Sequence, residues 1–213
     1  MEKIFLYGAG GQGKVVIDAL RSNHPMIEIG RVVDDDEQRH GKSILGHRAT
    51  APTEIGDERG FISIGDNASR MRIAKRFEGR LIVIVHASAV VAMDVTLGEG
   101  TILSAGSIVA PSARIGRCVI VNTGTSIDHD SVIEDGVHIA PGSRLCGNVR
   151  VGQGSLLGAG TIVVPGVRIG RNAFIHAGQT VTKDVADGET VRAQRSRPPA
   201  PTERNLAPDP VAP

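Results

Sequence analysis

From Val85 to Val181 an aliphatic residue returns at every sixth position without a break. The residue four places after each aliphatic is Ala, Val, Ser or Thr in every hexad but one, where it is Gln179. Because six is an even number, the alternation of side chains along a strand keeps all of these residues on one side of the chain. A period of six excludes a helical coiled coil and predicts identical short strands joined by identical tight turns. We therefore expect a narrow parallel β-solenoid over residues 85–186.

Residues 1–84 follow a different pattern, in which strand-like and helix-like segments alternate as in βαβ units. They predict a small α/β, Rossmann-like domain. We expect strands at residues 4–7, 29–33, 60–64 and 81–85 and helices at residues 14–20 and 68–77, with Asn67 as the N-cap of the second helix. Residues 187–213 lose the six-residue pattern, and the last eighteen of them contain six of the eleven prolines. We expect a disordered tail there.

Composition narrows the range of partners. The 24 basic and 23 acidic side chains leave a formal charge of +1, which gives no field to attract nucleic acid. The N-terminus has no secretory leader, and no apolar run approaches the roughly 18 residues of a membrane span. Two cysteines, Cys118 and Cys146, do not make a disulfide framework. We expect a cytoplasmic, soluble protein that binds small molecules.

A glycine-rich turn follows the first predicted strand. Residues 8–13 read G-x-G-x-x-G, and Asp34 follows the next strand at the spacing of a nucleotide-binding unit. A dinucleotide site normally needs two βαβαβ halves, and residues 1–84 supply only one, so a mononucleotide-sized ligand fits better than NAD. Alternatively, the glycine-rich segment forms a tight turn that binds no ligand. The three consecutive acids at residues 34–36 can likewise form a turn exposed to solvent.

Four histidines lie in the hexad region, and His129 differs from the others because it stands between two carboxylates, Asp128 and Asp130. A carboxylate can orient an imidazole and raise its basicity, as general-base catalysis requires. An exposed turn histidine is the alternative. His86 and His176 occupy the second place of their hexads without acidic sequence neighbours, and we expect both to be surface or turn residues.

The hexads at residues 115–120 and 151–156 resemble those of the hexapeptide-repeat acyltransferases. The resemblance implies a left-handed β-helix with three hexads per coil, so that residues three hexads apart stack, and it implies a homotrimer. The turn at residues 8–13, the acids at 34–35 and the segment 64–67 resemble one branch of that family. This branch contains the sialic-acid O-acetyltransferases and the UDP-4-amino-sugar N-acetyltransferases of the bacillosamine pathway.

The resemblance also implies roles for single residues. His129 would be the general base, Asp130 its partner, Asn122 a supporting residue and His138 a contact to acetyl-CoA. The backbone at Ala159 and Ala177 would meet the pantetheine arm. The nucleotide sugar would contact Gly10, Gly11, Gln12, Asp34, Asp35 and Gly65, although relatives often carry histidine in place of Gln12. We add Gly147, which stacks over His129, as the position where a thioester oxygen can reach a backbone N–H.

The predicted function is transfer of acetyl from acetyl-CoA to the amine of a nucleotide-linked 4-amino-4,6-dideoxy sugar, without a metal. O-acetylation of sialic acid or a related sugar by the same residues remains open. A zinc carbonic anhydrase on the same helix would need three converging histidines, and the sequence lacks a closely spaced pair. A binding module without catalysis predicts that His129 can be replaced without effect.

Overall fold

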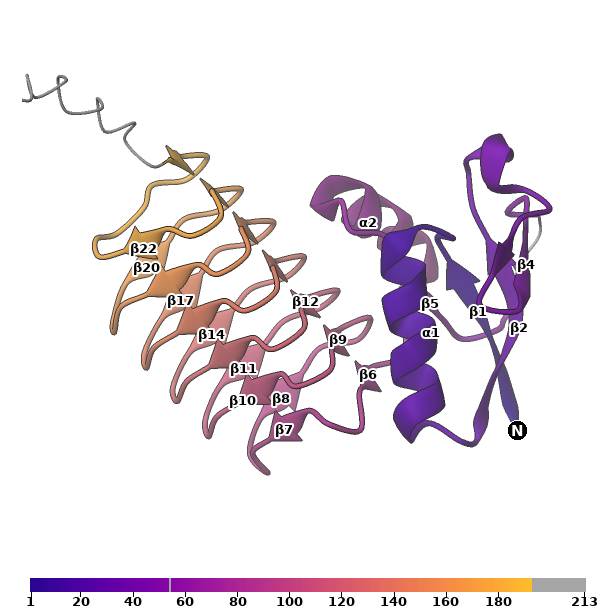
Figure 1. Cartoon of the computed structure of the whole chain (residues 1–213), viewed down its shortest axis with the longest axis horizontal. Coiled ribbons are helices and arrows are strands. Elements are labelled where there is room, and N and C mark those ends of the chain that lie inside the picture. The colour runs from indigo at the N-terminus through magenta and orange to yellow at the C-terminus, as the bar shows by residue number, and fades with distance from the viewer. Residues whose placement is uncertain (54, 193–213) are drawn as a thin grey trace, which may run out of the picture.

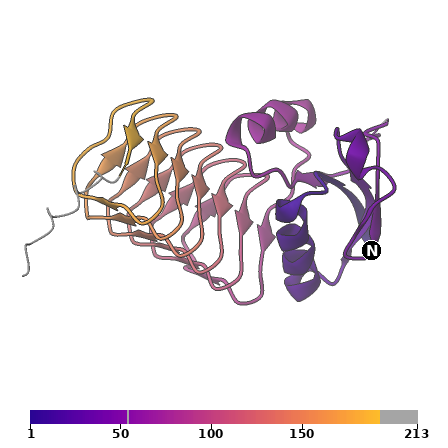
Figure 2. The same ribbon diagram turned by 45° about the horizontal axis from the view of Figure 1, so that its top comes forward.

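The computed structural model describes residues 1–53 and 55–192, so the tail at residues 193–213 that we expected to be disordered lies outside the described part. Figure 1 shows an elongated molecule, with an α/β unit at one end and a regular stack of short strands at the other. The same arrangement is seen after a turn of the view in Figure 2, where α2 lies between the two parts.

The N-terminal unit is a five-stranded sheet in the order β3-β4-β2-β1-β5. Its central strand β1 pairs in parallel with β2 and β5, which confirms the βαβ arrangement expected from the sequence. The apolar face of α1 packs on this sheet through Val16, Ile17 and Leu20. The elements are β1 (Glu2–Tyr7), α1 (Gly11–Asn23), β2 (Ile27–Val33), η1 (Glu37–Arg39), β3 (Ser43–Ile44), β4 (His47–Thr50), β5 (Gly60–Ile62), α2 (Asn67–Ala74) and η2 (Lys75–Phe77).

The sequence placed the N-cap of α2 one residue too late. Asp66 is the cap, because its carboxylate accepts a hydrogen bond from the backbone N–H of Ser69, and Asn67 is the first helical residue. The Asn67 side chain instead donates to the carbonyls of Gly154 and Ser155 in the solenoid. Asp66 therefore caps the helix, whereas the side chain of Asn67 connects the N-terminal unit to the solenoid.

From β6 onward the chain visits three sheets in turn, and each strand from β6 to β19 pairs in parallel with the strand three further on. Pairing joins residues one coil apart, for example Ile108 with Ser126. One sheet has β7 (Val90–Val91), β10 (Ile108–Val109), β13 (Ser126–Ile127), β16 (Arg144–Leu145), β19 (Ile162–Val163) and β22 (Thr180–Val181). A second has β8 (Thr96–Leu97), β11 (Arg114–Ile115), β14 (Val132–Ile133), β17 (Arg150–Val151) and β20 (Arg168–Ile169). The third has β6 (Ile84–Val85), β9 (Ile102–Leu103), β12 (Ile120–Val121), β15 (His138–Ile139), β18 (Leu156–Leu157), β21 (Phe174–Ile175) and β23 (Thr190–Val191).

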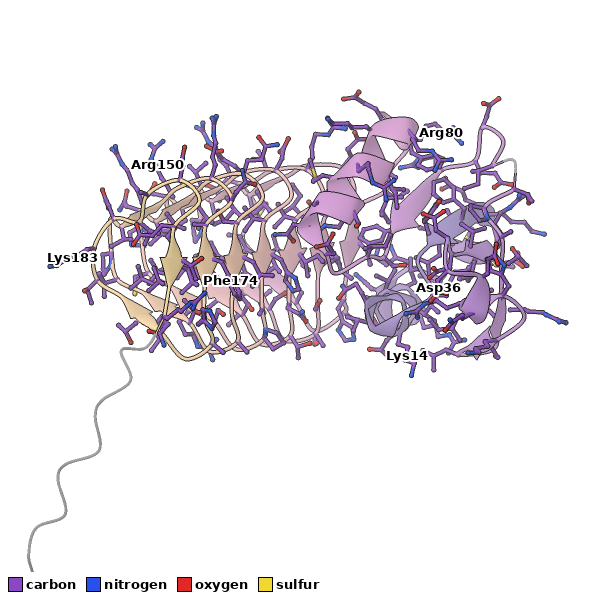
Figure 3. All side chains as sticks on the ribbon, turned by 90° about the horizontal axis from the view of Figure 1, so that it is seen from above. Lys14, Asp36, Arg80, Arg150, Phe174 and Lys183 are labelled. Atoms are coloured by element: carbon purple, nitrogen blue, oxygen red, sulfur yellow. The ribbon has the colours of Figure 1, made fainter. Side chains whose placement is uncertain are left out.

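The second residue of most of these strands points into the core, and the first points outward. Leu103, Ile127, Ile139, Leu157 and Ile175 are all completely buried. Long charged side chains such as Arg150 point away from the solenoid in Figure 3. The interior is therefore a single narrow column of aliphatic side chains, as the six-residue period predicts.

Small hydroxyl residues fill the inward turn positions and connect the coils. Thr101 donates to the carbonyl of Gly116 at 2.8 Å and accepts from the N–H of Val119 at 3.0 Å. Ser155 makes the same two contacts with Gly170 and Ala173. A buried hydroxyl is costly without partners. These hydroxyls are satisfied by the next coil, so they fix the stacking of coils as well as filling the turns.

The solenoid continues past residue 186, where the hexads end. β23 pairs with β21, so that Thr190 lies beside Phe174. Sequence spacing misses this strand because the last coil, which runs from Phe174 to Thr190 in this sheet, is shorter than the three hexads of the coils before it. We therefore propose a boundary near Arg192 for the second domain, in place of residue 186.

The two units share a hydrophobic core at their junction. Ile84, Ile102 and Ile120 of the solenoid are at most 1% exposed and belong to the cluster that contains Val16 and Ile17 of α1. Full burial of one such side chain contributes about 1.5–3 kcal/mol. The glycine turn at the start of α1 is therefore held in a fixed place on the solenoid. None of the helices in the described residues has the length and apolarity to cross a membrane.

Candidate active site

A cleft of about 400 Å³ lies at the carboxyl ends of β1, β2 and β5. The sequence singled out six residues for a nucleotide-sugar site, and the structure places all of them in the lining of this cleft: Gly10, Gly11, Gln12, Asp34, Asp35 and Gly65. The carboxyl edge of a parallel sheet is where α/β folds bind ligands. The side-chain nitrogen of Gln12 is buried without a hydrogen-bond partner.

The glycine turn is needed for the cleft to form. Gly8 has a φ of +114°, and a Cβ atom there would lie 2.7 Å from the carbonyl oxygen of Ser63. A Cβ atom on Gly13 would lie 2.7 Å from the carbonyl oxygen of Gly8. The first glycine thus permits the backbone conformation and the last permits α1 to begin close to the strand.

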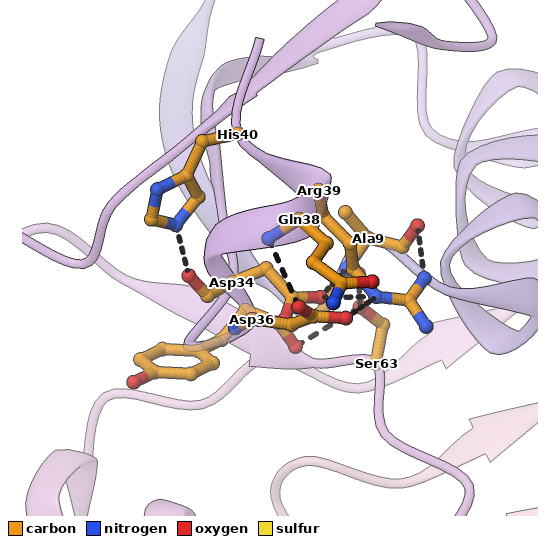
Figure 4. Close-up of polar contacts among 9 residues, drawn as sticks. Ala9, Asp34, Asp36, Gln38, Arg39, His40 and Ser63 are labelled. Atoms are coloured by element: carbon orange, nitrogen blue, oxygen red, sulfur yellow. Dashed lines mark hydrogen bonds and ion pairs between the residues drawn. The ribbon is translucent and has the colours of Figure 1, made fainter. Parts of the chain in front are cut away.

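The three consecutive acids differ in exposure, because Asp34 is partly buried whereas Asp35 and Asp36 are exposed. Asp34 accepts hydrogen bonds from the N–H groups of Ala9 at 2.7 Å and Asp36 at 2.9 Å, and lies 3.7 Å from the guanidinium of Arg39 (Figure 4). Asp35 accepts from the hydroxyl of Tyr7 at 2.6 Å. Burial and the Asp35 carboxylate raise the pKa of Tyr7. One carboxylate therefore holds the glycine turn to the second strand, and the next one faces the cleft.

On the solenoid, His129 and Asp130 form the predicted pair. They lie in the turn between β13 and β14, with Nδ1 of His129 2.8 Å from a carboxylate oxygen of Asp130. The hydrogen bond to Asp130, followed by the charge of Asp128, raises the pKa of His129. The imidazole is 54% exposed, so Nε2 is accessible to a substrate. Asp130 has a φ of 59°, a left-handed conformation that Asp tolerates better than most residues.

Gly147 stacks directly against the imidazole. A Cβ atom at this position would lie 2.6 Å from both Cε1 and Nε2 of His129. The absence of a side chain therefore leaves space for the reactive edge of the ring. This is the stacking that a spacing of three hexads predicts.

Asn122 and His138 form a second pair, on neighbouring coils. The side-chain nitrogen of Asn122 lies 3.2 Å from Nε2 of His138. An amide nitrogen only donates, so Nε2 accepts and the proton of the neutral ring lies on Nδ1. Burial, with a smaller effect of the nearby Arg70, lowers the pKa of His138 to about 4, against a weak opposing effect of the Gly65 backbone. The ring is therefore neutral near pH 7, and Nδ1 is buried without a partner at hydrogen-bond geometry.

The two pairs occupy different edges of the solenoid. His129 and Gly147 lie between the strands of the first and second sheets, at β13–β14 and β16–β17. Asn122 lies in the turn that leaves the third sheet after β12, and Ala159 and Ala177 lie in the equivalent turns after β18 and β21. Within one chain, the residues expected to form a single active site are therefore divided between two edges.

Comparisons with known proteins identify both parts of the chain. Residues 3–77 match the family described as the PglD N-terminal domain, and residues 148–183 match the bacterial transferase hexapeptide family of six repeats. The acetyltransferase domain of PglB from Neisseria gonorrhoeae superposes with a TM-score of 0.82 at 29% identity, over 89% of this chain and 96% of that one. PerB from Caulobacter crescentus, solved with CoA and GDP-perosamine, is 32% identical, with a TM-score of 0.81 over 89% of this chain and 93% of that one. The chain belongs to the hexapeptide-repeat sugar acetyltransferases.

A curated relative from Bacillus subtilis, a UDP-N-acetylbacillosamine N-acetyltransferase, is 32% identical over 114 residues, which are 49% of this chain and 52% of the relative. The match therefore spans about half the length of that protein. The resemblance to this acetyltransferase family and the fold class, an α/β domain followed by a left-handed β-helix, are both confirmed. The described residues contain no group of three His, Cys, Asp or Glu side chains placed to hold a metal ion.

Sequence reasoning missed several residues of this acetyltransferase. Tyr7, Arg39 and Arg72 line the cleft at the glycine turn, and their residue types alone do not indicate that position. His86 lies in the turn after β6, as a surface or turn residue was expected to, but its side chain is only 17% exposed and Nε2 lies 3.6 Å from a carboxylate oxygen of Asp18 in α1. The acid comes from a distant part of the chain, so a search of sequence neighbours could not find it.

Proposed function

We propose that the protein transfers acetyl from acetyl-CoA to the amine of a nucleotide-linked 4-amino-4,6-dideoxy sugar. The observation that carries this proposal is the coexistence of a nucleotide-sized cleft and an exposed His129–Asp130 pair on one rigid chain. Two relatives support the substrate class, since one is named for N-acetylation of a UDP-linked sugar and another was solved with GDP-perosamine and CoA. The two free cysteines fit a reducing, cytoplasmic location.

In this mechanism Nε2 of His129 removes the proton from the sugar amine as the nitrogen attacks the thioester carbonyl carbon. Asp130 holds the ring in the tautomer with its proton on Nδ1 and stabilises the imidazolium that forms. The carbonyl oxygen becomes an oxyanion, for which we assign the backbone N–H of Gly147 as a donor. Collapse of the tetrahedral intermediate breaks the C–S bond, the imidazolium of His129 returns its proton to the departing thiolate, and the amide and the CoA thiol leave.

His138, kept neutral by burial, would contact acetyl-CoA, with Asn122 fixing the tautomer of the ring. The backbone at Ala159 and Ala177 would support the pantetheine arm, because both lie on the same edge as Asn122. Gly10, Gly11, Gln12, Asp34, Asp35 and Gly65 would contact the nucleotide sugar. His129 would then come from the neighbouring subunit.

A homotrimer would bring the two edges together. The first sheet presents exposed apolar side chains at three of its outward positions, with Val90 at 61%, Ile108 at 45% and Ile162 at 43% exposure. Val90 and Ile108 are neighbours, whereas Ser126 and Arg144 lie between Ile108 and Ile162. Exposed apolar side chains of this kind on one face favour association through it. This sheet lies between the His129 edge and the Asn122 edge, so a contact through it places one edge of each subunit beside the other edge of the next.

Mixed trimers test the shared site. We expect His129→Ala and His138→Ala each to lose at least about a hundredfold in activity when pure. Trimers that contain both variants should be much more active than either pure variant. In them, the intact His138 edge of a His129→Ala chain can meet the intact His129 edge of a His138→Ala chain. Separately tagged chains purified in tandem give the measurement. Mixed assemblies as inactive as the pure variants would show that each chain uses its own two edges.

The pH profile tests the role of Asp130. A general base acts when deprotonated, so kcat/KM falls as the pH drops through the pKa of His129, which Asp130 and Asp128 raise. Asp130→Asn removes the larger cause while keeping a residue that tolerates the left-handed backbone. We expect the acidic limb to move to lower pH and the plateau to fall about tenfold as the ring loses its orientation. A limb that stays in place would belong to the sugar amine and not to His129.

The acceptor is tested by following the release of the CoA thiol. Acetyl-CoA is offered with a UDP-4-amino-4,6-dideoxy sugar, its GDP counterpart or sialic acid. The proposal predicts fast release with one of the nucleotide amino sugars only. Release with sialic acid alone would replace N-acetylation by O-acetylation, and no release with any of them would remove the proposed function while leaving the fold unchanged.

A further inference from the structure

Arg70, in α2, is the largest side chain that is fully buried in the described residues, with 0% exposure. All five of its N–H groups donate hydrogen bonds. Nε donates to the carbonyl of Cys118 at 2.9 Å, and one terminal nitrogen donates to the carbonyls of Ile64 and Gly65, both at 3.0 Å. The other donates to the carbonyl of Gly136 and the side-chain oxygen of Asn67, both at 2.8 Å. Four backbone carbonyls and one amide therefore surround the guanidinium.

This environment is unusual for a buried charge, because no carboxylate within the described residues lies at ion-pair distance from Arg70. Burial lowers the pKa of the guanidinium to about 10, so it is still protonated near pH 7. A buried cation costs free energy unless its donors are all satisfied, and an apolar side chain of similar size would avoid that cost. The bonds that Arg70 makes must therefore have a use other than stability.

The acceptors of Arg70 come from the cleft and from the solenoid turns that lead into the third sheet, where His138 lies in β15. Ile64 and Gly65 line the nucleotide cleft. Cys118 and Gly136 lie one coil apart, in equivalent turns of the solenoid. In a trans peptide the C=O and N–H groups lie in one plane and point in opposite directions. By holding the carbonyls of Ile64 and Gly65, Arg70 therefore also fixes the direction of the next N–H groups, those of Gly65 and Asp66.

Asn67 extends the same connection to a third coil. Its side-chain oxygen accepts from Arg70, while its side-chain nitrogen donates to the carbonyls of Gly154 and Ser155. The segment 64–67 is thus attached to three consecutive coils through two side chains. Arg70 also lies close enough to His138 to lower the pKa of that imidazole.

We propose that Arg70 is a positioning residue, which holds the segment 64–67 of the nucleotide cleft at a fixed distance from the Asn122–His138 pair. The guanidinium does not touch the substrates. It sets the place of the nucleotide sugar relative to the acetyl donor, and this role rests on the proposed function. A rigid, forked side chain suits the task, because lysine has the charge but cannot reach five acceptors in two directions.

The test compares Arg70→Lys and the milder Asn67→Ala with a control, Arg117→Gln. Arg117 also joins the two units, through Glu78 at 2.7 Å and Glu99 at 2.6 Å, but it does not touch the cleft. We expect Arg70→Lys to raise the KM for the nucleotide sugar about tenfold, with the KM for acetyl-CoA within about twofold of the wild-type value. Asn67→Ala should shift the same KM in the same direction by less, and the control should leave both KM values unchanged.

Hydrogen exchange provides a readout that does not depend on activity. Amides of residues 64–67 should exchange faster in Arg70→Lys and not in Arg117→Gln. If both KM values change in parallel, or if the control has the same effect as Arg70→Lys, Arg70 is merely structural. If the wild type fails to acetylate any nucleotide amino sugar, the proposed function fails, while unchanged exchange at residues 64–67 would separately contradict the anchoring role.

Discussion

Replacing His129 by alanine is expected to lower kcat by about 10²–10⁴-fold, the usual contribution of a general base. The KM values for both substrates should change little, because Nε2 acts on the reacting proton and the cleft proposed for the nucleotide is formed by other residues. The chain should fold normally, since the ring is half exposed and bonds only to Asp130. Steady-state kinetics gives kcat and the KM values, and thermal unfolding of the same preparation shows whether the variant is folded.

The matched control is His86→Ala, which removes another solenoid histidine. His86 bonds to Ser88 and lies near Asp18 of α1, away from the proposed site. It should retain wild-type kcat with at most a small decrease in Tm. A loss of less than about tenfold in His129→Ala would mean that the sugar amine attacks without a protein base.

Adding one methyl group at Gly147 is expected to lower kcat by about a hundredfold, with almost no change in Tm. The new Cβ atom would lie 2.6 Å from Nε2 of His129, so the imidazole has to rotate away. The ring is exposed and moves at small cost in folding free energy. A shift of about 1 Å in a reacting group is enough for a loss of this size.

For Gly152→Ala, on the same solenoid, we expect the opposite result, a lower Tm with kcat retained. A Cβ atom on Gly152 would lie 2.6 Å from the backbone of Gly170 and Arg171 in the next coil, which cannot move without opening the stack. Overpacking of this kind costs about 1–3 kcal/mol, so Tm should fall while kcat at low temperature is retained. Equal effects of the two variants on Tm and on kcat would contradict the assignment of Gly147 to the site.

The parts of the structure that follow from sequence are those set by local repetition. An aliphatic residue at every sixth place forces a strand of fixed length, and the resulting coil of three hexads correctly places Gly147 over His129. The glycines of the first turn also act locally, since Gly8 and Gly13 approach backbone atoms that the βαβ unit always brings near. Asp130 bonds to its own neighbour in the chain.

The parts that could not be predicted depend on contacts between distant segments. Arg70 is 48 residues from Cys118 and 66 from Gly136, and an arginine in the middle of a polar helix normally faces water. His138 is neutral because it is buried where the α/β unit meets the solenoid, which the hexad pattern does not show. The hexad pattern does not predict the final strand β23, because the coil that ends there is shorter than the others.

The division of the site between two edges also has no sequence signal, because hexad numbers do not tell which turns face a neighbour. Asn122 and His129 are close together in the chain, yet they lie on different edges of the solenoid. Short sequence separation suggests one cluster, whereas the threefold winding separates the two residues. The exposed side chains of Val90, Ile108 and Ile162 on the first sheet indicate which face a second subunit would cover.

The most direct test of acetyl transfer to a nucleotide amino sugar is to identify the product. Wild-type protein is incubated with acetyl-CoA and each UDP- or GDP-linked 4-amino-4,6-dideoxy sugar, and the products are examined by mass spectrometry and NMR. Our account predicts one nucleotide sugar that carries a single acetyl group on the C4 nitrogen, with no such product from His129→Ala. An acetyl group on a hydroxyl, or equal product from the wild type and His129→Ala, would contradict it.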